Sequence, residues 1–299
     1  MIAGSPFSPN RSERREFWIA MIFIAPWVIG LLAFTVYPMF LSLYYSLTEY
    51  KVVSDPEFVG LQNYLNLIKD KVFLKALGNT IYIICVGVPV TLLAALTVSV
   101  LLDSKELRKY SFFRVVFFLP TLVPLIISCI LWIWLLNSEN GLINALLGVF
   151  GIAGPAWLGD PSWAKPAFIL MMVWGSGGTI IIFLAGLQDI PVSLYEAASL
   201  EGAGFLRKTF SITIPMLSPV ILYNAVTLVI AAFQWFAEPF IMTEGGPDNA
   251  TMFYSLYLYQ NAFQFFKMGY ASAMAWILLL IALCVIFLLF KGTSKFSQE

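Results

Sequence analysis

The 299-residue chain lacks histidine, contains only three cysteines and carries little charge, since 11% of its residues are Asp, Glu, Lys or Arg. Without histidine, a Ser-His-Asp triad, a Cys-His pair and histidine ligation of a metal are all excluded. Cys85, Cys129 and Cys284 lie in apolar runs without paired spacing, which indicates neither a disulfide framework nor a zinc site. The net charge of zero gives no reason to expect nucleic-acid binding. We therefore expect no catalytic residue, no metal site and no enzymatic activity in this chain alone.

The scarce charges leave six long apolar runs between them. Each run exceeds the roughly 20 residues that cross a hydrocarbon core about 30 Å thick. The runs free of Asp, Glu, Lys and Arg are 17–48, 76–102, 115–138, 166–188, 209–237 and 268–290. They predict an all-α integral membrane protein with six transmembrane helices, at about 18–46, 78–102, 112–136, 165–187, 213–242 and 269–290. Pro120 and Pro124 predict a kink in the third span.

The polar segments predict the domain organisation and the orientation. A tail (1–16) precedes the first span and an outer amphipathic segment (17–75), and a five-span core (76–291) is followed by a second tail (292–299). The first run is too long for a signal peptide and lacks an A-x-A-like cleavage site, so we interpret it as a retained span. Eleven of the 17 Lys and Arg residues fall on the side that holds both termini. By the positive-inside rule, both termini and the segment 189–212 face the cytoplasm.

The segment 189–212 has more structure than a connection between spans requires. Ser193-Leu194-Tyr195-Glu196 has the S-x-x-E capping-box pattern, which predicts a helix starting near residue 193. Gly202 and Gly204 predict a break, after which a second helix from about 205 merges into the fifth span near Pro215. A plain turn explains each residue separately. It does not explain why small residues leave a shallow surface at 197, 198, 202 and 203, which favours a docking surface.

One motif in this segment resembles a known family. Glu196-Ala197-Ala198, then Gly202, then Ile212-x-Ile214-Pro215 is similar to the EAA loop of ABC-importer permeases, E-A-A-x3-G-x9-I-x-L-P. Ile214 in place of leucine is the one departure. The resemblance implies a cytoplasmic EAA coupling helix between spans 4 and 5. The residues that it implies for coupling to an ATPase are Glu196, Ala197, Ala198, Gly202, Gly204 and Pro215.

Three further motifs resemble the carbohydrate-uptake, maltose-type branch of that family: Phe58-Val59-Gly60-Leu61-x-Asn63-Tyr64, Asn79-Thr80 and Gly245-Gly246-Pro247. The resemblance implies an ATP-driven, binding-protein-dependent importer of a neutral mono- or oligosaccharide, working by alternating access in the plasma (inner) membrane of a prokaryote. Its implied partners are the lipid bilayer, a second permease subunit, two copies of a cytoplasmic P-loop ATPase and an extracytoplasmic solute-binding protein. ATP and Mg would bind the ATPase, and this chain would bind no cofactor.

Five residues are candidates for the solute pathway: Trp174, Gly178, Gln234, Trp235 and Glu238. Polar groups inside a span are costly and usually face the protein interior, and aromatic rings beside hydrogen-bonding groups suit sugars. Gln234 and Glu238 are four residues apart and would share a helical face. Glu238 is equally compatible with an interfacial carboxylate, and both tryptophans are equally compatible with plain helix packing.

Two other functions stay open at this point. A self-sufficient secondary transporter or channel should carry several charged groups inside its spans, and this chain offers only Glu238. A glycerol-phosphate importer shares the family pattern, but phosphate favours buried basic residues, and the apolar runs that define the predicted spans contain none. The segment from Gly202 to Thr209 nearly matches a P-loop, yet Arg207 replaces the glycine that lets the backbone cradle phosphate.

Overall fold

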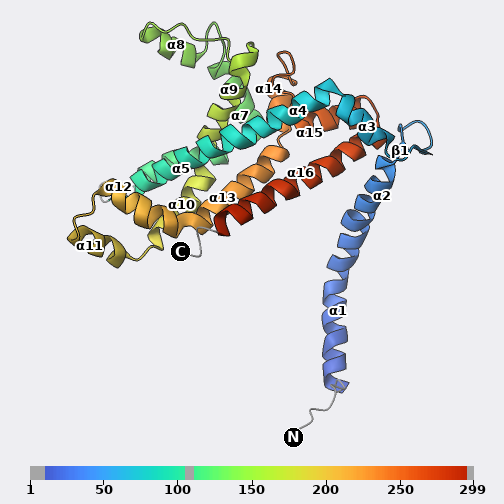
Figure 1. The fold of residues 1–299 in the computed structure, drawn as a ribbon, viewed down its shortest axis with the longest axis horizontal. Coiled ribbons are helices and arrows are strands. Elements are labelled where there is room, and N and C mark those ends of the chain that lie inside the picture. The colour runs from blue at the N-terminus through green and yellow to red at the C-terminus, as the bar shows by residue number, and fades with distance from the viewer. Residues whose placement is uncertain (1–10, 105–110, 295–299) are drawn as a thin grey trace.

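The computed structural model describes residues 11–104 and 111–294. Most of the predicted N-terminal tail, the end of the C-terminal tail and four of the basic residues used for orientation (Lys105, Arg108, Lys109 and Lys295) lie outside the described residues. Figure 1 shows a bundle of slanted helices from which the N-terminal helix departs at one end.

Four continuous helices are long and apolar enough to cross a membrane: Arg14–Ser46, Lys71–Asp103, Phe205–Phe233 and Met268–Lys291. Each of the first three contains a short π-helical segment. The first comprises α1 (Arg11–Leu31), η1 (Leu32–Val36) and α2 (Tyr37–Ser46), the second α4 (Lys71–Tyr82), η2 (Ile83–Gly87) and α5 (Val88–Asp103), and the third α12 (Phe205–Lys208), η4 (Thr209–Thr213) and α13 (Ile214–Phe233). The fourth is the single helix α16 (Met268–Ser294).

Two further spans are bent pairs of helices. α6 (Ser111–Phe118) continues into the 3-10 segment η3 (Leu119–Leu122), and the chain then bends by 101° into α7 (Leu125–Leu135). Between α9 (Pro161–Trp174) and α10 (Gly177–Gln188) the chain bends by 48°. Counting each pair as one span gives up to six spans among the described residues.

The kink predicted in the third span is confirmed and is sharp. Pro124 disfavours the helical conformation at the residue before it, and Val123 is extended, with φ −75° and ψ 126°. The bend in the fourth span was not predicted. It falls at Gly175, the C-cap of α9, and Ser176, the N-cap of α10.

The fifth span is shorter than the predicted 213–242. α13 ends at Phe233, three non-helical residues follow, and α14 (Ala237–Met242) begins a new helix. Pro239 explains the interruption, because in a continuous helix its ring would clash with the carbonyl of Trp235 and its missing N–H would leave that carbonyl unpaired.

The outer segments contain more structure than their polar sequence indicated. β1 (Thr48–Glu49) pairs antiparallel with β2 (Glu57–Phe58), ahead of α3 (Gln62–Lys69). Three helical segments between spans were not predicted: α8 (Leu142–Val149), α15 (Tyr254–Tyr259) and the π-helical η5 (Gln260–Gln264). Each is at most eight residues long and lies in a turn-rich part of the sequence, so no helical pattern indicated it.

The outer segment predicted to be amphipathic contains α3, which buries one face and exposes the other. Leu65 and Ile68 are exposed, whereas Asn63 and Leu67 are buried. Asn63 turns this face toward the end of α2, because its Nδ2 donates to the carbonyls of Ser46 (2.9 Å) and Thr48 (2.8 Å). The fold therefore uses a polar residue to seat this helix.

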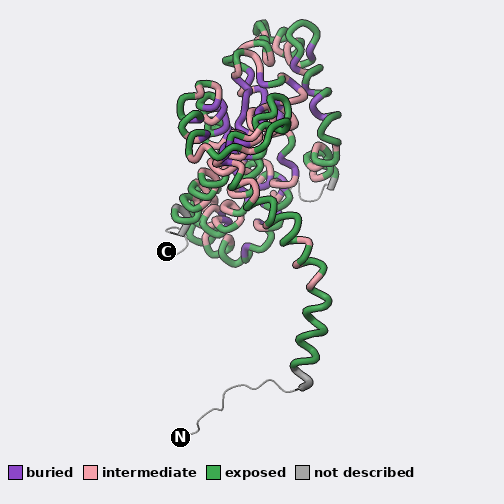
Figure 2. Tube along the Cα trace, turned by 90° about the vertical axis from the view of Figure 1, so that its right-hand side faces the viewer, coloured by how far each residue is buried: buried purple, intermediate pink, exposed green. Residues whose placement is uncertain are grey.

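The burial pattern separates the first span from the rest. Purple, buried residues in Figure 2 gather in the bundle, while the long N-terminal helix is green along most of its length. The most hydrophobic 18-residue window of Arg14–Ser46 has none of its residues buried. The core clusters, with Ile83, Phe233 and Phe253 in one of them, join α5, α9, α13 and the outer segment before α15.

Candidate functional site

A central cavity of about 780 Å³ lies where three spans are interrupted. Its walls include residues from the break after α6, the bend between α9 and α10, and the interruption after α13. The cavity is lined by all five residues that the sequence indicated for the solute pathway, namely Trp174, Gly178, Gln234, Trp235 and Glu238. Interrupted helices suit such a place, because irregular backbone at membrane depth is tolerated where it lines a cavity.

Gln234 and Glu238 reach this cavity by a route that differs from the predicted one. They do not share a helical face, because the helix ends between them: Gln234 is the C-cap of α13 and Glu238 lies in the first turn of α14. Gln234 is exposed to the cavity and Glu238 is half-buried. The interruption caused by Pro239 thus brings an amide and a carboxylate to one wall.

The two tryptophans both pack against neighbours and line the cavity. The Trp235 ring stacks on Phe253, with centroids 5.3 Å apart, and meets Phe168 edge-on at 5.5 Å. Trp174 meets Trp132 edge-on at 5.8 Å. Because neighbouring rings hold them in place, these aromatic surfaces are fixed before any ligand arrives.

Gly177 and Gly178 of the fourth span have different roles. A Cβ at Gly177 would lie 2.5 Å from the Phe117 carbonyl oxygen, so this glycine allows α10 to pack closely on α6. A Cβ at Gly178 would meet nothing within 4 Å. Gly178 therefore leaves open space in the cavity rather than a helix contact.

The prediction that the spans lack basic residues is wrong at Arg114, which lies in α6, and at Lys165. α9 begins at Pro161, so Lys165 falls in its second turn, where its Nζ donates to Asn79 Oδ1 (3.1 Å). The Asn79 Nδ2 donates in turn to the carbonyls of Asn249 (2.8 Å) and Met252 (3.0 Å). Two sequence motifs, Asn79-Thr80 and the turn after Gly246-Pro247, are thereby joined at the end of the bundle opposite α11, which the sequence predicts to be the outer end.

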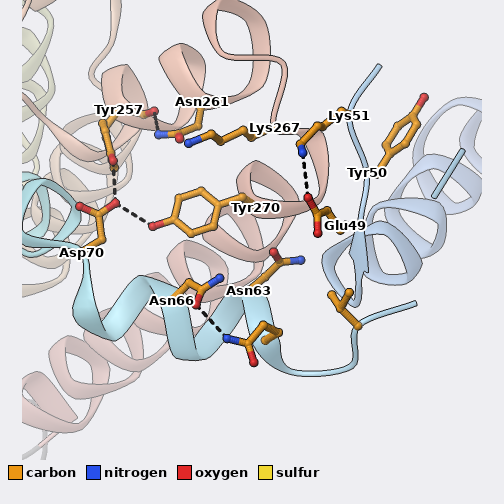
Figure 3. A pocket seen from close by; sticks show the side chains of 12 residues that line it. Glu49, Tyr50, Lys51, Asn63, Asn66, Asp70, Tyr257, Asn261, Lys267 and Tyr270 are labelled. Carbon is orange, nitrogen blue, oxygen red and sulfur yellow. Dashed lines mark hydrogen bonds and ion pairs between the residues drawn. The ribbon is translucent and has the colours of Figure 1, made fainter. Parts of the chain in front are cut away.

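A second group of hydrogen bonds at the outer end centres on Asp70, which the sequence analysis did not single out (Figure 3). Its Oδ1 accepts from the amides of Val72 (2.9 Å) and Phe73 (3.2 Å) and so caps α4. Its Oδ2 accepts from the hydroxyls of Tyr257 (2.6 Å) and Tyr270 (2.7 Å). An aspartate just before an apolar helix is a readable cap signal, but the tyrosine partners are not.

Burial and hydrogen bonding shift the pKa values of Asp70 and Tyr257. Burial by itself raises the pKa of Asp70, but the bonds from Tyr257, Tyr270 and the two amides together outweigh it and leave the pKa below its usual value. Burial, followed by the bond to Asp70, raises the pKa of Tyr257 to about 12. The carboxylate therefore stays ionised and the Tyr257 hydroxyl stays protonated at neutral pH.

At the opposite end of the bundle, the loop after α10 forms α11 (Val192–Leu200). Its start agrees with the prediction, but the predicted capping box does not form. The N-cap is Pro191 and no side chain caps the helix, because the helix starts one residue early and leaves Ser193 inside the first turn. Glu196 and Ala197 are exposed and Ala198 is half-buried.

The helix α11 ends at Gly202 in a left-handed turn. Gly202 has φ +76°, its amide bonds to the Ser199 carbonyl (3.0 Å), and the Ala203 amide bonds to the Ala198 carbonyl (2.9 Å). This pair of bonds is the Schellman arrangement, which favours glycine at that position. Gly204 has an ordinary φ of −72° and is the N-cap of α12.

The helix after this turn runs into the fifth span, as predicted. α12, η4 and α13 form one continuous helix, Phe205–Phe233, with Pro215 in the first turn of α13. Two side-chain bonds attach α11 to it: the Tyr195 and Thr213 hydroxyls are 2.9 Å apart, and Lys208 donates to Ser199 (2.7 Å). Leu200 is 91% exposed beside them.

Comparison with known proteins places the chain in a family. A family model described as the binding-protein-dependent transport system inner membrane component matches residues 68–292. The chain is 39% identical to the probable ABC transporter permease protein YesP of Bacillus subtilis (strain 168) over 290 residues, covering 95% of this chain and 93% of that protein. It is 36% identical to the lactose transport system permease protein LacF of Rhizobium radiobacter, covering 92% of this chain and 93% of LacF.

A solved structure shares the fold. A chain of a bacterial alginate ABC transporter, in complex with alginate pentasaccharide-bound periplasmic protein, superposes with a TM-score of 0.79 at 20% identity, covering 95% of this chain and 97% of that one. The resemblance to carbohydrate-uptake ABC permeases is therefore confirmed. The chain belongs to the family of binding-protein-dependent transport system inner membrane components and is a multi-pass ABC transporter permease of the carbohydrate-uptake branch.

Proposed function

We propose that the chain is the permease subunit of an ATP-driven, binding-protein-dependent importer of a neutral mono- or oligosaccharide. The observation that carries this proposal is the central cavity, in which aromatic rings and an amide gather at three interrupted spans. In this proposal residues 76–291 form the five-span translocation core, and 17–75 form the first span with its outer segment.

The lining of the cavity supports a neutral sugar as the solute. Glu238 is the one charged side chain among the described residues that line it. A single carboxylate with no cation repels a phosphate group, so the cavity disfavours glycerol phosphate. Trp174, Trp235 and Phe236 supply apolar surfaces, while Gln234 offers an amide that both donates and accepts hydrogen bonds. This combination suits a ring with apolar faces and hydroxyl edges.

The bundle spans the membrane six times in this proposal, with each bent pair counted as one span and both termini in the cytoplasm. In Figure 1, α11 lies at the same end of the bundle as the C-terminal end of α16. The excess of basic residues on that side of the chain supports its cytoplasmic placement. The loop 189–212 then faces the compartment that contains ATP.

The partners follow from this placement. A second permease subunit would complete the transmembrane unit, two copies of a P-loop ATPase would bind ATP and Mg, and an extracytoplasmic binding protein would deliver the solute. The exposed surface of α11, with Glu196, Ala197 and the turn at Gly202, supports ATPase docking. This chain hydrolyses no ATP itself in the proposal.

The continuous helix Phe205–Phe233 supplies a physical route for coupling. It starts three residues after Gly202 and ends at Phe233, next to Gln234 in the cavity wall, so it connects the docking turn to the cavity. At about 1.5 Å per residue the helix is on the order of 40 Å long, and in this proposal it transmits a displacement of α11 to the cavity. Alternating access then consists of moving this helix while the interrupted spans open and close the cavity.

The proposal is tested by uptake into proteoliposomes that contain the assembled transporter. We expect ATP-dependent accumulation of a radiolabelled neutral saccharide, and we expect Gln234→Ala to raise the KM severalfold because one hydrogen-bonding side chain is lost. Gln264→Ala, an exposed amide outside the cavity, is the matched control and should leave the KM unchanged. Uptake of glycerol phosphate in place of every neutral saccharide would overturn the solute class. Transport by this chain alone without ATP would overturn the importer.

A further inference from the structure

A second cavity, separate from the central one, lies at the outer end of the bundle (Figure 3). It has a volume of about 410 Å³, within the range of roughly 300–1,000 Å³ that is usual for small-molecule sites. Its walls come from the β1 hairpin, α3, η5 and the start of α16. The two cavities share no lining residue. We call this second cavity the outer pocket.

Two buried amides give the outer pocket unused hydrogen-bond acceptors. Asn63 is 8% exposed and Asn261 is 2% exposed, and both line the pocket. Asn63 uses its Nδ2 for two backbone carbonyls, and Asn261 uses its Nδ2 for the Tyr257 carbonyl (2.9 Å). No described donor reaches the Oδ1 of either residue. Both oxygens are therefore available as acceptors on the wall of the outer pocket.

The Tyr270 hydroxyl adds one more acceptor. It donates its proton to Asp70, so its oxygen still accepts a bond on its other side, whereas the Tyr257 hydroxyl already interacts with the Asn261 side chain. The wall of the outer pocket thus presents acceptors together with donors, since Lys267, Gln62 and Asn66 also line it. Such a wall suits a ligand whose groups both donate and accept without charge, as hydroxyl groups do.

The charges of the outer pocket cancel. Asp70 and Glu49 face Lys51 and Lys267, and the Glu49–Lys51 pair is closed at 2.8 Å. A metal cation would meet two ammonium groups and an aspartate whose oxygens are already bonded. An anion would meet two carboxylates. Charge balance therefore selects a neutral ligand over either ion.

The Tyr270 ring gives the outer pocket an aromatic surface. Figure 3 shows the Tyr270 ring extending across the middle of the outer pocket, between Asp70 and the Glu49–Lys51 pair. A ring face beside amide acceptors suits the apolar C–H face and hydroxyl edge of a sugar.

We propose that the outer pocket is a second saccharide-binding site, which holds a neutral sugar unit outside the translocation cavity. The proposal rests on the proposed function only for the class of ligand that is present on this side of the membrane. The polar, charge-balanced wall is a property of the pocket itself.

A thiol-protection experiment tests this site in the full chain in lipid nanodiscs. Asn66, an exposed residue of α3 that lines the pocket, is replaced in Asn66→Cys, and its rate of labelling is followed by mass spectrometry of the peptide. The probes are lactose, maltose and cellobiose, each at millimolar concentration. When a probe reaches ten times its Kd, we expect labelling to slow roughly tenfold by mass action. Lys69→Cys, on the same helix but outside the lining, is the matched control and should label at an unchanged rate.

Second substitutions assign the protection to one of the two cavities. Asn261→Ala in the Asn66→Cys chain should weaken the protecting saccharide roughly tenfold, because one buried hydrogen bond is lost. If Asn261→Ala does not reach the membrane, Gln62→Leu on the exposed rim serves the same purpose. Gln234→Ala, in the central cavity, should leave the protection intact.

Three outcomes would overturn the outer site: no protection by any of the three probes, equal protection at Lys69→Cys, or protection that disappears with Gln234→Ala but survives Asn261→Ala. Uptake by the assembled transporter is measured in parallel. Protection without ATP-driven uptake of any neutral saccharide would remove the proposed function and leave the outer site standing.

Discussion

The two ends of the bundle are built in opposite ways. At the outer end, side-chain bonds join segments far apart in the chain: Tyr257 and Tyr270 reach Asp70 across 187 and 200 residues, and Asn79 reaches Asn249 across 170. At the inner end, the two side-chain bonds that attach α11 span 18 and 9 residues. The outer end is held together by side-chain hydrogen bonds between distant parts of the chain, whereas α11 at the inner end is exposed. The outer end is therefore preorganised within the chain, and the exposed α11 supports the proposal that a partner completes the inner end.

The largest effect is expected at the inner end, from Gly202→Asp. Asp tolerates the left-handed conformation at φ +76°, so the turn still forms, but a carboxylate then occupies the docking surface. We expect the permease to stay in the membrane and ATP-driven uptake to fall by roughly a hundredfold, equivalent to about 2.7 kcal/mol of lost coupling. Uptake by proteoliposomes measures this.

Gly202→Asn separates charge from shape in that experiment. Asn adopts the left-handed conformation as readily as Asp and has nearly the same volume, but it is neutral. It should retain most of the uptake. Equal loss in both variants would show that the turn needs glycine for its backbone alone, and normal uptake by Gly202→Asp would remove the docking claim.

The next effect is expected at the outer end, from Asp70→Ala. The change removes the cap of α4 and leaves two half-buried tyrosine hydroxyls without their acceptor. We expect the free energy of unfolding to fall by about 2–4 kcal/mol, with uptake per folded molecule unchanged. Thermal unfolding in nanodiscs measures it, and Asp55→Ala, at an exposed aspartate of the hairpin, should be neutral. A neutral Asp70→Ala would contradict the preorganised outer end.

The hydrogen bonds of Asp70 also predict a smaller, pH-dependent effect on stability. Because the folded-state pKa of Asp70 lies below its usual value, its stabilising contribution is present above the ordinary carboxyl range and is lost as the pH falls through the lowered pKa. The difference in Tm between the unmodified chain and Asp70→Asn should therefore narrow below about pH 4. A difference that widens on acidification would reverse the sign of the shift.

The smallest effect is expected back at the inner end, from Gly204→Ala. Gly204 has φ −72°, and a Cβ there would meet nothing within 4 Å, so alanine costs the fold nothing that the structure shows. Uptake and the amount of permease in the membrane should stay within about twofold, because surface substitutions of this kind change stability by under ~0.5 kcal/mol. A large loss would extend the partner's footprint from Gly202 to Gly204.

The sequence predicted those features that depend on local pattern. Apolar runs located the spans, Pro120 and Pro124 located a kink, and Gly202 located the end of a helix, because each acts on its own neighbours. The five solute-pathway candidates also fall in one cavity, although their role there stays a prediction. The coupling role of Glu196 and its neighbours likewise stays a prediction.

The rest could not be predicted because it depends on contacts distant in sequence. The acceptor of Tyr257 and Tyr270 lies almost two hundred residues away, and Asn63 faces inward only because the end of α2 offers it two carbonyls. The capping box at Ser193 failed for a local reason, since one residue of shift in a helix start removes a cap. Lys165 was assigned to the end of a span that in fact begins four residues earlier.

The central claim, that the inner end is completed by an ATPase, is tested most directly by affinity purification of the chain from its native membrane in mild detergent, followed by mass spectrometry. We predict that a P-loop ATPase and a second permease are recovered with the unmodified chain and with Gly202→Asn, and that the ATPase is lost with Gly202→Asp. Recovery of the chain alone, still moving solute in liposomes without ATP, would contradict the claim.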